Sequence, residues 1–508
     1  MVISSTLRYR FAGLGLSLLM AAPAHALVFA VGDIVISTVS GSTLDAASPI
    51  TLQQFGLNAG GTVATAAGTL VLPQTASGAN SAISGEYGSA SEGFLQRSVD
   101  GKLLTIAGYG VNAQTFNAAP LATYGNAALG QTTSLTGQPV TTVPRVVATI
   151  GAGGTVDTTT QLTGVFNTNN PRSAGTIDGT SFYVTGQGSG SDTTGGVFYA
   201  TKGATTATPI NTSLAGTNPY NKTGSNTNTA TVGTEARDAQ LVTDSAGVTS
   251  LVVSRDFKAN GTPNSTADLR TLTNATGGLP TSATGLQAAR VAPDVLSKTG
   301  ANYGSIELTA TLTNGVNTPR FTTAGNHFVY VSPEQFFFAD DNTLYIADSG
   351  APKSGSADAA GYGEGGLQKW ARNPSTGVWS IVYDLVNGLN LVDNATKNAN
   401  TPTAAGVTGL FGLTGAVVNG SVELFATSFG LNELSNSFLY EVTDSLANVD
   451  PSVASIEAFT TLYAAPSGTS IRGVAFASAE IGINVPEPAS MALLASMFGA
   501  ASLVRRRR

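Results

Sequence analysis

The residues that could do chemistry in this chain are carboxylates and arginines, because the sequence contains no cysteine and only two histidines, His25 and His327. A thiolate zinc site, a cysteine nucleophile and a zinc site built from several histidines are therefore excluded. His25 lies in the N-terminal segment 1–26, which is a predicted signal peptide, so a Ser-His-Asp triad would have to use His327. No Gly-x-Ser-x-Gly elbow precedes a helix. Any binding or reaction would depend on Asp, Glu and Arg side chains.

Five charged residues stand at one recurring place, just before an apolar strand that begins a hairpin. They are Glu92, Arg172, Arg237, Glu334 and Arg472, with Thr408 or Gly409 at the same place in one further repeat. In a ring of repeats, equivalent strand starts lie around one mouth of the central channel. The five side chains are then candidates for a polar-ligand or ion site. Alternatively, they pair with one another and lock neighbouring repeats together.

Aspartates in the hairpin turns offer a second kind of site. Calcium or glycosidase carboxylate chemistry could use Asp100, Asp178, Asp244, Asp340 and Asp341. Turns also select Asp for its local hydrogen bonds, and no calcium-loop spacing is present. We therefore expect no metal and no cofactor, with calcium as the alternative.

The better calcium candidate is a long Gly-rich loop that carries three carboxylates, Asp348, Asp358 and Glu364. The hairpin after this loop contains Trp370 and Trp379. These two rings could stack on a sugar, or they could pack between repeats.

The elements that must position these residues are short strands. The stretch from Gln335 to Leu385 predicts four of them, at Gln335 to Ala339, Thr343 to Ala347, Gly366 to Ala371 and Val378 to Tyr383. One antiparallel meander of this size has two apolar faces and needs neighbours of its own kind to cover them, as in a β-propeller.

The same hairpin recurs along the chain, and its first strands begin near Gly93, Ser173, Asp238, Gln335, Leu410 and Gly473. The last repeat is incomplete, because Ser470 to Ala477 has no hairpin partner after it. Three strand candidates near the start of the chain would complete that repeat, at Gly32 to Val39, Ile50 to Phe55 and Thr69 to Leu72. We predict an all-β propeller over residues 27–480, closed by N-terminal strands that join the last blade. Six blades are expected, and seven if the longest interval, before Gln335, contains another.

The two ends of the chain predict export. Residues 1–26 have a positive region with Arg8 and Arg10, an apolar run and the small-x-small site Ala24-His25-Ala26, which is typical of a signal peptide. Near the other end, Val485-Pro486-Glu487-Pro488 precedes an apolar run that would form a short transmembrane helix. Four arginines follow that run, Arg505, Arg506, Arg507 and Arg508, and favour a cytoplasmic end.

This tail, residues 485–508, resembles the PEP-CTERM sorting signal of Gram-negative bacteria, in which Pro486, Glu487 and Pro488 match the motif. The same tail is sometimes called an ice-binding protein C-terminal motif, which does not imply ice binding. The resemblance implies cleavage by signal peptidase and by an exosortase-type protease, transient anchoring in the inner membrane, and release to the outer surface or the extracellular matrix. The body, with SEGFLQRSVDGKLLTIAGYG and FFFADDNTLYIADSG, is similar to exported propeller-like proteins.

Composition limits the partners. Residues 27–488 hold 18 of the 24 Lys and Arg residues and all 31 Asp and Glu residues, so this segment carries a net charge of −13. Nucleic acid is not an expected partner, because phosphate binding needs a basic surface.

Two functions remain open. The first is a non-enzymatic surface or matrix protein that binds or scaffolds exopolysaccharide in a biofilm. The alternative is a propeller hydrolase or lyase that acts on extracellular polysaccharide or lactones. Paired charges and a plugged channel would favour the first, and bound calcium with carboxylates gathered at one mouth would favour the second.

Overall fold

The predicted meander forms one four-stranded antiparallel sheet in chain order, consisting of β20 (Pro333–Asp340), β21 (Thr343–Asp348), β22 (Gly366–Arg372) and β23 (Trp379–Leu385). Its first and last turns contain Asp340 to Asn342 and Asn373 to Gly377, as expected from their turn-forming residues. Side chains alternate between the two faces of each strand. Phe336, Leu344 and Ile346 therefore pack on one neighbouring sheet, and Tyr345 and Ala347 pack on the other.

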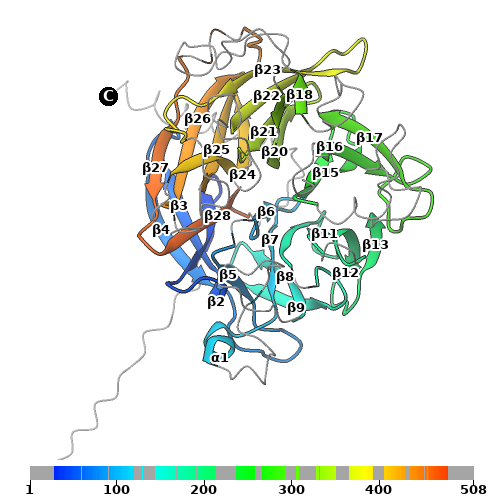
Figure 1. Cartoon of the computed structure of the whole chain (residues 1–508), viewed down its shortest axis with the longest axis vertical. Helices are drawn as coiled ribbons and strands as arrows, with labels where there is room; N and C mark the ends of the chain where they lie inside the picture. The colour runs from blue at the N-terminus through cyan, green and yellow to red at the C-terminus, as the bar shows by residue number, and fades with distance from the viewer. Residues whose placement is uncertain are drawn as a thin grey trace, which may run out of the picture.

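The computed structural model describes residues 28–58, 60–89, 91–118, 129, 143–167, 169–188, 193–211, 236–257, 266–292, 305–307, 328–330, 332–350, 365–392, 406–430, 435–450, 452, 454 and 456–478. These residues form a six-bladed β-propeller (Figure 1). We number the blades 1 to 6 in the order of the chain around the ring, and the meander above is blade 5.

Each blade is an antiparallel sheet whose first strand lies nearest the axis. Blade 1 contains β28 (Thr469–Phe476), β1 (Ile34–Ser40), β3 (Thr51–Leu57) and β4 (Ala64–Val71). Blade 2 contains β6 (Gln96–Arg97), β7 (Leu103–Tyr109), β8 (Arg145–Gly151) and β9 (Val156–Leu162). Blade 3 contains β10 (Pro171–Gly175), β11 (Ser181–Gly186), β12 (Gly196–Thr201) and β13 (Thr208–Asn211).

The remaining blades follow the same plan. Blade 4 contains β14 (Ala239–Thr243), β15 (Thr249–Phe257), β16 (Thr266–Thr273) and β17 (Gln287–Ala292). Blade 6 contains β24 (Val407–Val418), β25 (Ser421–Gly430), β26 (Phe438–Ser445) and β27 (Thr460–Ala464). The prediction of six blades is confirmed.

The ring is closed by the two ends of the described chain. The C-terminal strand β28 pairs antiparallel with β1, with Ile34 opposite Phe476 and Ser40 opposite Thr469. The three N-terminal strands therefore complete the last repeat, as the sequence predicted. This pairing hides edges that an open sheet would expose.

The elements that the sequence did not predict lie outside the four-strand plan. β2 (Ala46–Pro49) and β5 (Ser84–Tyr87) pair with each other and extend the sheet of blade 2, near the helix α1 (Ala113–Ala118). β18 (Ser305–Glu307) and β19 (Phe328–Tyr330) form a two-stranded sheet in the long interval before blade 5.

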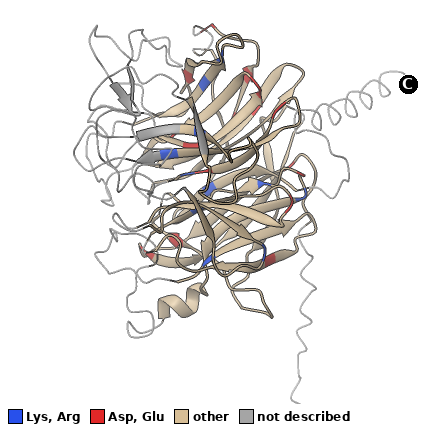
Figure 2. Cartoon of the chain, turned by 90° about the vertical axis from the view of Figure 1, so that its right-hand side faces the viewer, with Lys and Arg blue, Asp and Glu red and all other residues tan. Residues whose placement is uncertain are grey.

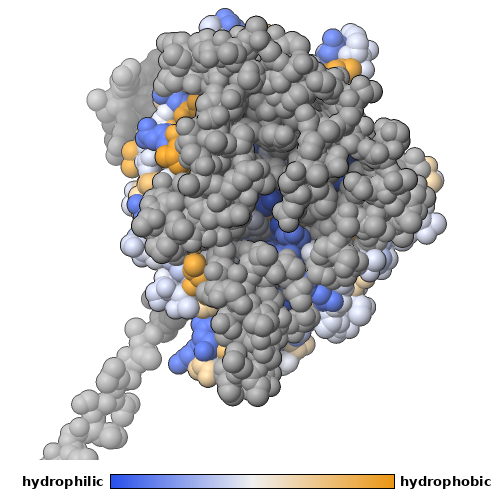
Figure 3. Space-filling model, in the orientation of Figure 1, coloured by the Kyte–Doolittle hydropathy of each residue, from blue (hydrophilic) through white to orange (hydrophobic). Residues whose placement is uncertain are grey.

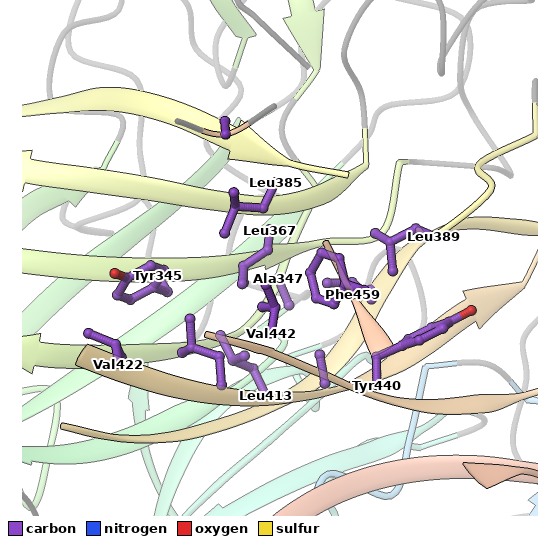
Figure 4. Close-up of a cluster of buried hydrophobic side chains, with 14 of the residues drawn as sticks. Tyr345, Ala347, Leu367, Leu385, Leu389, Leu413, Val422, Tyr440, Val442 and Phe459 are labelled. Carbon is purple, nitrogen blue, oxygen red and sulfur yellow. The ribbon is translucent and has the colours of Figure 1, made fainter. Parts of the chain in front are cut away.

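The hydrophobic core is divided among the six junctions between neighbouring blades, with one cluster in each junction. Figure 4 shows the cluster between blades 5 and 6, where Ala347 and Leu367 of blade 5 meet Leu413 and Val442 of blade 6. Because both faces of every blade are covered, no blade could bury its apolar side chains alone. Charged residues are sparse over the described part of the chain (Figure 2).

Both predicted ends, 1–26 and 485–508, lie outside the described residues, as does His327. Within the described part of the chain, no helix is long and apolar enough to cross a membrane.

Candidate functional site

The five charged residues predicted at the inner-strand starts lie inside the ring rather than on an open mouth. Glu92, Arg172, Glu334 and Arg472 are buried. The side chain of Arg237 is 12% exposed, so it alone retains limited access to solvent. In the face shown in Figure 3, hydrophilic residues form the floor of a hollow near the middle of the ring.

Two of the five residues form an ion pair between neighbouring blades. Arg237 Nη1, just before β14 of blade 4, lies 3.3 Å from Glu334 Oε1 on β20 of blade 5. Arg172 on β10 donates to Ala236 O at 3.3 Å and to Gln187 Oε1 at 3.2 Å. These contacts connect blades 3, 4 and 5.

Glu92 is the centre of a second group. Its Oε1 accepts a 2.6 Å bond from the Glu86 amide, and its Oε2 accepts bonds from Tyr109 Oη at 2.7 Å and Asn170 Nδ2 at 3.3 Å. Burial raises the pKa of Glu92, and the charge of Arg472 and these hydrogen bonds oppose that rise. Arg472 Nη2 donates to Glu86 O at 3.4 Å, which joins blade 1 to the sheet of blade 2, and Asn170 lies just before β10 of blade 3.

Sequence reasoning missed three members of this group, Glu86, Tyr109 and Arg145. Arg145 begins β8, and its guanidinium lies 4.8 Å from the ring centre of Tyr109 while donating to Val143 O at 2.7 Å. Arg145 stands directly before the apolar run Val146 to Ile150, and a charged residue at the start of such a run was the signal available. Glu86 lies on β5, whose sequence Ser-Gly-Glu-Tyr lacks the alternation that reveals a strand.

A cavity of about 10 Å³ lies beside this group and is lined by Glu92, Arg472, Ser37 and Gly85, among others. That volume accommodates about one water molecule. Ligand pockets generally measure about 300–1,000 Å³. This cavity therefore cannot hold a sugar ring.

Amide side chains fill the axis of the ring. Gln335 of blade 5 donates from Nε2 to Leu95 O of the facing blade 2 at 3.4 Å, and its Oε1 accepts from the Leu413 amide of blade 6 at 3.1 Å. Gln96 of blade 2 hydrogen-bonds the Asp238 carboxyl and donates to Ala239 O of blade 4 at 2.9 Å. Four of the six blades are thus bonded across the centre.

Asp238 is the buried acid of this axial network. Gln240 Nε2 donates to its Oδ2 at 2.7 Å, in addition to the bond from Gln96. Burial raises the pKa of Asp238 to about 6, although its hydrogen bonds favour the ionised form.

Aromatic rings occupy another part of the centre. Phe94, just before β6, stacks on Phe411 of β24 with ring centres 4.2 Å apart, and Phe411 also contacts Phe429. All three rings are buried. The segment around Glu92 to Arg97 therefore fills the central space that an open channel would need.

The turn aspartates serve their own turns. Asp178 accepts bonds from the amide and hydroxyl of Thr180 at 2.9 and 2.6 Å, and Asp244 accepts from the Val248 amide at 2.8 Å. Asp341 reaches the next turn and accepts from the Ser245 amide at 2.9 Å. The bonds of Asp178 and Asp244 are the local role that Asp plays in turns, whereas the bond of Asp341 links the turns of blades 4 and 5.

The calcium candidate loop lies largely outside the described residues, and only Asp348 of its three carboxylates is placed. Asp348 is buried and accepts bonds from the amides of Ser332 and Gly350 and from Gln368 Nε2 at 3.1, 2.9 and 2.8 Å. Among the described residues, no group of three or more acidic or His side chains could hold a metal ion.

The two tryptophans pack between blades 4 and 5. Trp370 and Trp379 are buried in the same cluster as Val252 and Leu269 of blade 4. Trp370 Nε1 donates to Gln368 Oε1 at 3.1 Å, and Trp379 meets Phe338 edge to face at 5.8 Å. Their burial leaves no face on which a sugar could stack.

No family model matches the sequence, and a search of curated proteins finds no match either. Among solved structures, the chain is similar to a GH74 enzyme of Niastella koreensis, with 10% identity, a TM-score of 0.33, and coverage of 86% of this chain and 46% of that one. It therefore spans about half the length of that enzyme.

A second similar structure is an oligogalacturonate lyase in complex with manganese, at 8% identity and a TM-score of 0.35, covering 82% of this chain and 92% of that one. An oligogalacturonate lyase of Vibrio parahaemolyticus gives 8% identity and a TM-score of 0.33, with 81% and 91% covered. Similarity at these levels does not transfer an activity. By its own sheets, this chain is an all-β, six-bladed propeller.

Proposed function

We propose that this protein is an exported, non-enzymatic component of the cell surface or extracellular matrix that binds or scaffolds the organism's own polysaccharide. The observation that carries the proposal is the filled axis. The glutamines Gln96 and Gln335 and the stacked rings of Phe94 and Phe411 occupy the centre, where a propeller enzyme would admit its substrate.

The charge pairing supports the same proposal. Arg237 and Glu334 neutralise each other between blades, and the buried acid Glu92 already accepts three hydrogen bonds. A general acid or base must reach a proton on its substrate. A buried carboxyl beside a cavity for one water molecule has no such reach.

Sorting is the second part of the proposal, and the tail sequence supports it. Signal peptidase would remove residues 1–26, the apolar run after Pro486-Glu487-Pro488 would hold the chain in the inner membrane, and an exosortase-type protease would release it. Substitution of all three motif residues by alanine should leave the protein in the membrane fraction. Release of that variant at the normal rate would contradict the sorting proposal.

The binding part is tested by a glycan-array screen of the purified protein, run once with calcium and once with EDTA. We expect saturable binding to acidic or neutral polysaccharide that EDTA leaves unchanged. A heat-unfolded sample is the control for nonspecific adhesion. Silence across the array with a folded sample would contradict polysaccharide binding, and loss of binding in EDTA would contradict the expectation of a metal-free protein.

A further inference from the structure

A buried ion pair joins blades 5 and 6 at a place that the proposed function does not use. Lys369 Nζ on β22 lies 2.9 Å from Asp444 Oδ2 on β26. Their side chains are 1% and 0% exposed. Such complete burial of an amine against a carboxylate is costly, because both groups lose their hydration.

The surrounding groups hold both reactive atoms in place. Lys369 Nζ also donates to Ser445 O at 2.7 Å, Asn448 O at 2.8 Å and Tyr383 Oη at 3.0 Å. Each oxygen of the Asp444 carboxyl accepts a phenol, Tyr345 Oη at Oδ2 and Tyr383 Oη at Oδ1, the latter at 2.7 Å.

The apolar cluster between the two blades lies on one side of this pair. In Figure 4, Tyr345 stands at one end of the cluster with its hydroxyl pointing away from the other labelled side chains. The amine and the carboxyl therefore meet at the edge of a water-excluding core.

A third acid completes the arrangement. Glu457, in the segment after β26, hydrogen-bonds the Asp444 side chain. Burial, followed by the negative charge of Asp444, raises the pKa of Glu457 to about 8, with Lys369 acting in the opposite direction. Glu457 is consequently a neutral carboxylic acid at neutral pH, in contact with the Asp444 carboxyl.

We propose that Lys369 and Asp444 react with each other to form an intramolecular amide bond, with Glu457 as the proton donor and acceptor. An amine and a carboxyl held in contact gain a large effective concentration over the same groups in solution. The neighbouring acid supplies the proton transfer that acyl substitution needs.

The reaction needs no further reagent. Proton transfer within the pair gives a neutral amine and a carboxylic acid, and Nζ attacks Cγ of Asp444 to form a tetrahedral intermediate. Tyr345 and Tyr383 donate hydrogen bonds to the oxygens on which negative charge develops. Glu457 protonates the departing oxygen, the C–O bond breaks, and one water molecule leaves. The Glu457 carboxylate then takes the proton from Nζ, which restores the neutral acid, and no electrons are gained or lost.

The bond would connect β22 of blade 5 to the end of β26 of blade 6 and enclose the chain between them. Exported proteins commonly gain such covalent links from disulfides, but this chain has no cysteine. An amide would give the junction a permanent link that reducing agents do not break.

Peptide mass spectrometry of the purified full chain tests the proposal. We expect the peptide containing Lys369 to be joined to the peptide containing Asp444, lighter than their sum by the mass of one water molecule. The denatured chain should also migrate faster than an unlinked variant. Recovery of both peptides unlinked would overturn the proposal.

Two variants and one internal control sharpen the result. Lys369→Arg keeps the positive charge but should show no link. Glu457→Gln keeps a hydrogen-bonding side chain without the acid, and the linked fraction should fall at least tenfold. An unchanged fraction in Glu457→Gln would overturn the role of Glu457.

The ion pair between Lys202 and Asp157, 2.8 Å apart but exposed, should stay unlinked in every sample. A link there would show that contact alone suffices and would contradict the mechanism.

Discussion

At the scale of single residues, this protein buries several charged groups, both near the axis of the ring and between neighbouring blades. Asp238, Glu334, Arg172 and Lys369 are all essentially inaccessible to solvent. Burial of a charge is tolerated when a partner and further hydrogen bonds compensate for lost hydration. The ion pairs and hydrogen bonds named above for these residues run mainly between blades, so they help to fix how the blades meet.

Asp238 predicts a specific pH dependence. Its pKa is about 6 in the folded chain against 3.8 for an ordinary Asp, so the folded state holds this proton more tightly. The resulting stability is present below pH 4 and is lost as pH rises through 6, by about 3 kcal/mol at most. Asp238→Asn should lack this loss. Urea unfolding of both proteins at pH 4, 5, 6 and 7 measures the free energy of unfolding. The same pH dependence in both proteins would contradict the prediction.

The pair of Arg237 and Glu334 predicts a non-additive response. Arg237→Met leaves the Glu334 carboxylate buried without this guanidinium, and we expect a loss of about 3–5 kcal/mol in the free energy of unfolding. Adding Glu334→Leu should recover most of that loss, because the buried carboxylate that lost the Arg237 guanidinium is then absent as well. A double-mutant cycle by urea unfolding gives the coupling. Strictly additive losses would show that the pair does not act as a unit.

At the scale of elements, short apolar runs between turns made most of the fold predictable. The strands of blade 5 and the hairpins of the other blades were identifiable because β-rich runs, such as Phe336 to Ala339 and Leu344 to Ala347, are separated by Asp or Asn turns. The pairing of β2 with β5 was not predictable. The sequence of β5, Ser-Gly-Glu-Tyr, is not an apolar run, and its Glu86 is buried only by tertiary contacts.

The candidate site was predictable only in part, for a related reason. Five charged residues could be placed at equivalent strand starts from their spacing alone. The contacts that fill the axis could not be predicted. The hydrogen bond between Gln335 and Leu95, for example, spans 240 positions and exists only after the ring has closed. The filling of the axis is thus a property of closure rather than of any one repeat.

The inner strand of blade 1 gives an element-level prediction. A Cβ on Gly473 would collide with the Leu95 amide nitrogen and lie 2.8 Å from Gly93 O, both in the backbone segment that fills the axis. Gly473→Ala should therefore cost about 1–3 kcal/mol or more in unfolding free energy. Gly153→Ala is the matched control, since no heavy atom lies within 4 Å of its added Cβ. Thermal unfolding compares them, and equal melting temperatures would contradict this packing.

At the scale of the whole molecule, closure by β28 is what makes the six sheets one structure. Its side chains Ile471, Val474 and Phe476 are buried between blades 6 and 1. Burial of each side chain stabilises the folded state by about 1.5–3 kcal/mol. Their sum is comparable with the roughly 5–15 kcal/mol of net stability that folded proteins possess.

A chain that ends after Pro466 should consequently lose cooperative unfolding and bind a hydrophobic dye. A chain that ends after Ser478 keeps β28 and should unfold like the complete protein, which makes it the matched control. Circular dichroism in urea with dye fluorescence distinguishes the two. A cooperative transition in the shorter chain, at the midpoint of the control, would contradict closure by β28.

The most direct test of the central claim, that this propeller scaffolds polysaccharide without cleaving it, is to incubate the protein with purified exopolysaccharide from its own source. Co-sedimentation measures binding, and light scattering after size separation measures the polysaccharide chain length. We predict saturable co-sedimentation with no change in chain length, because the axis is filled and the buried acids are already bonded. Shortened chains, with new reducing or unsaturated ends, would contradict the account.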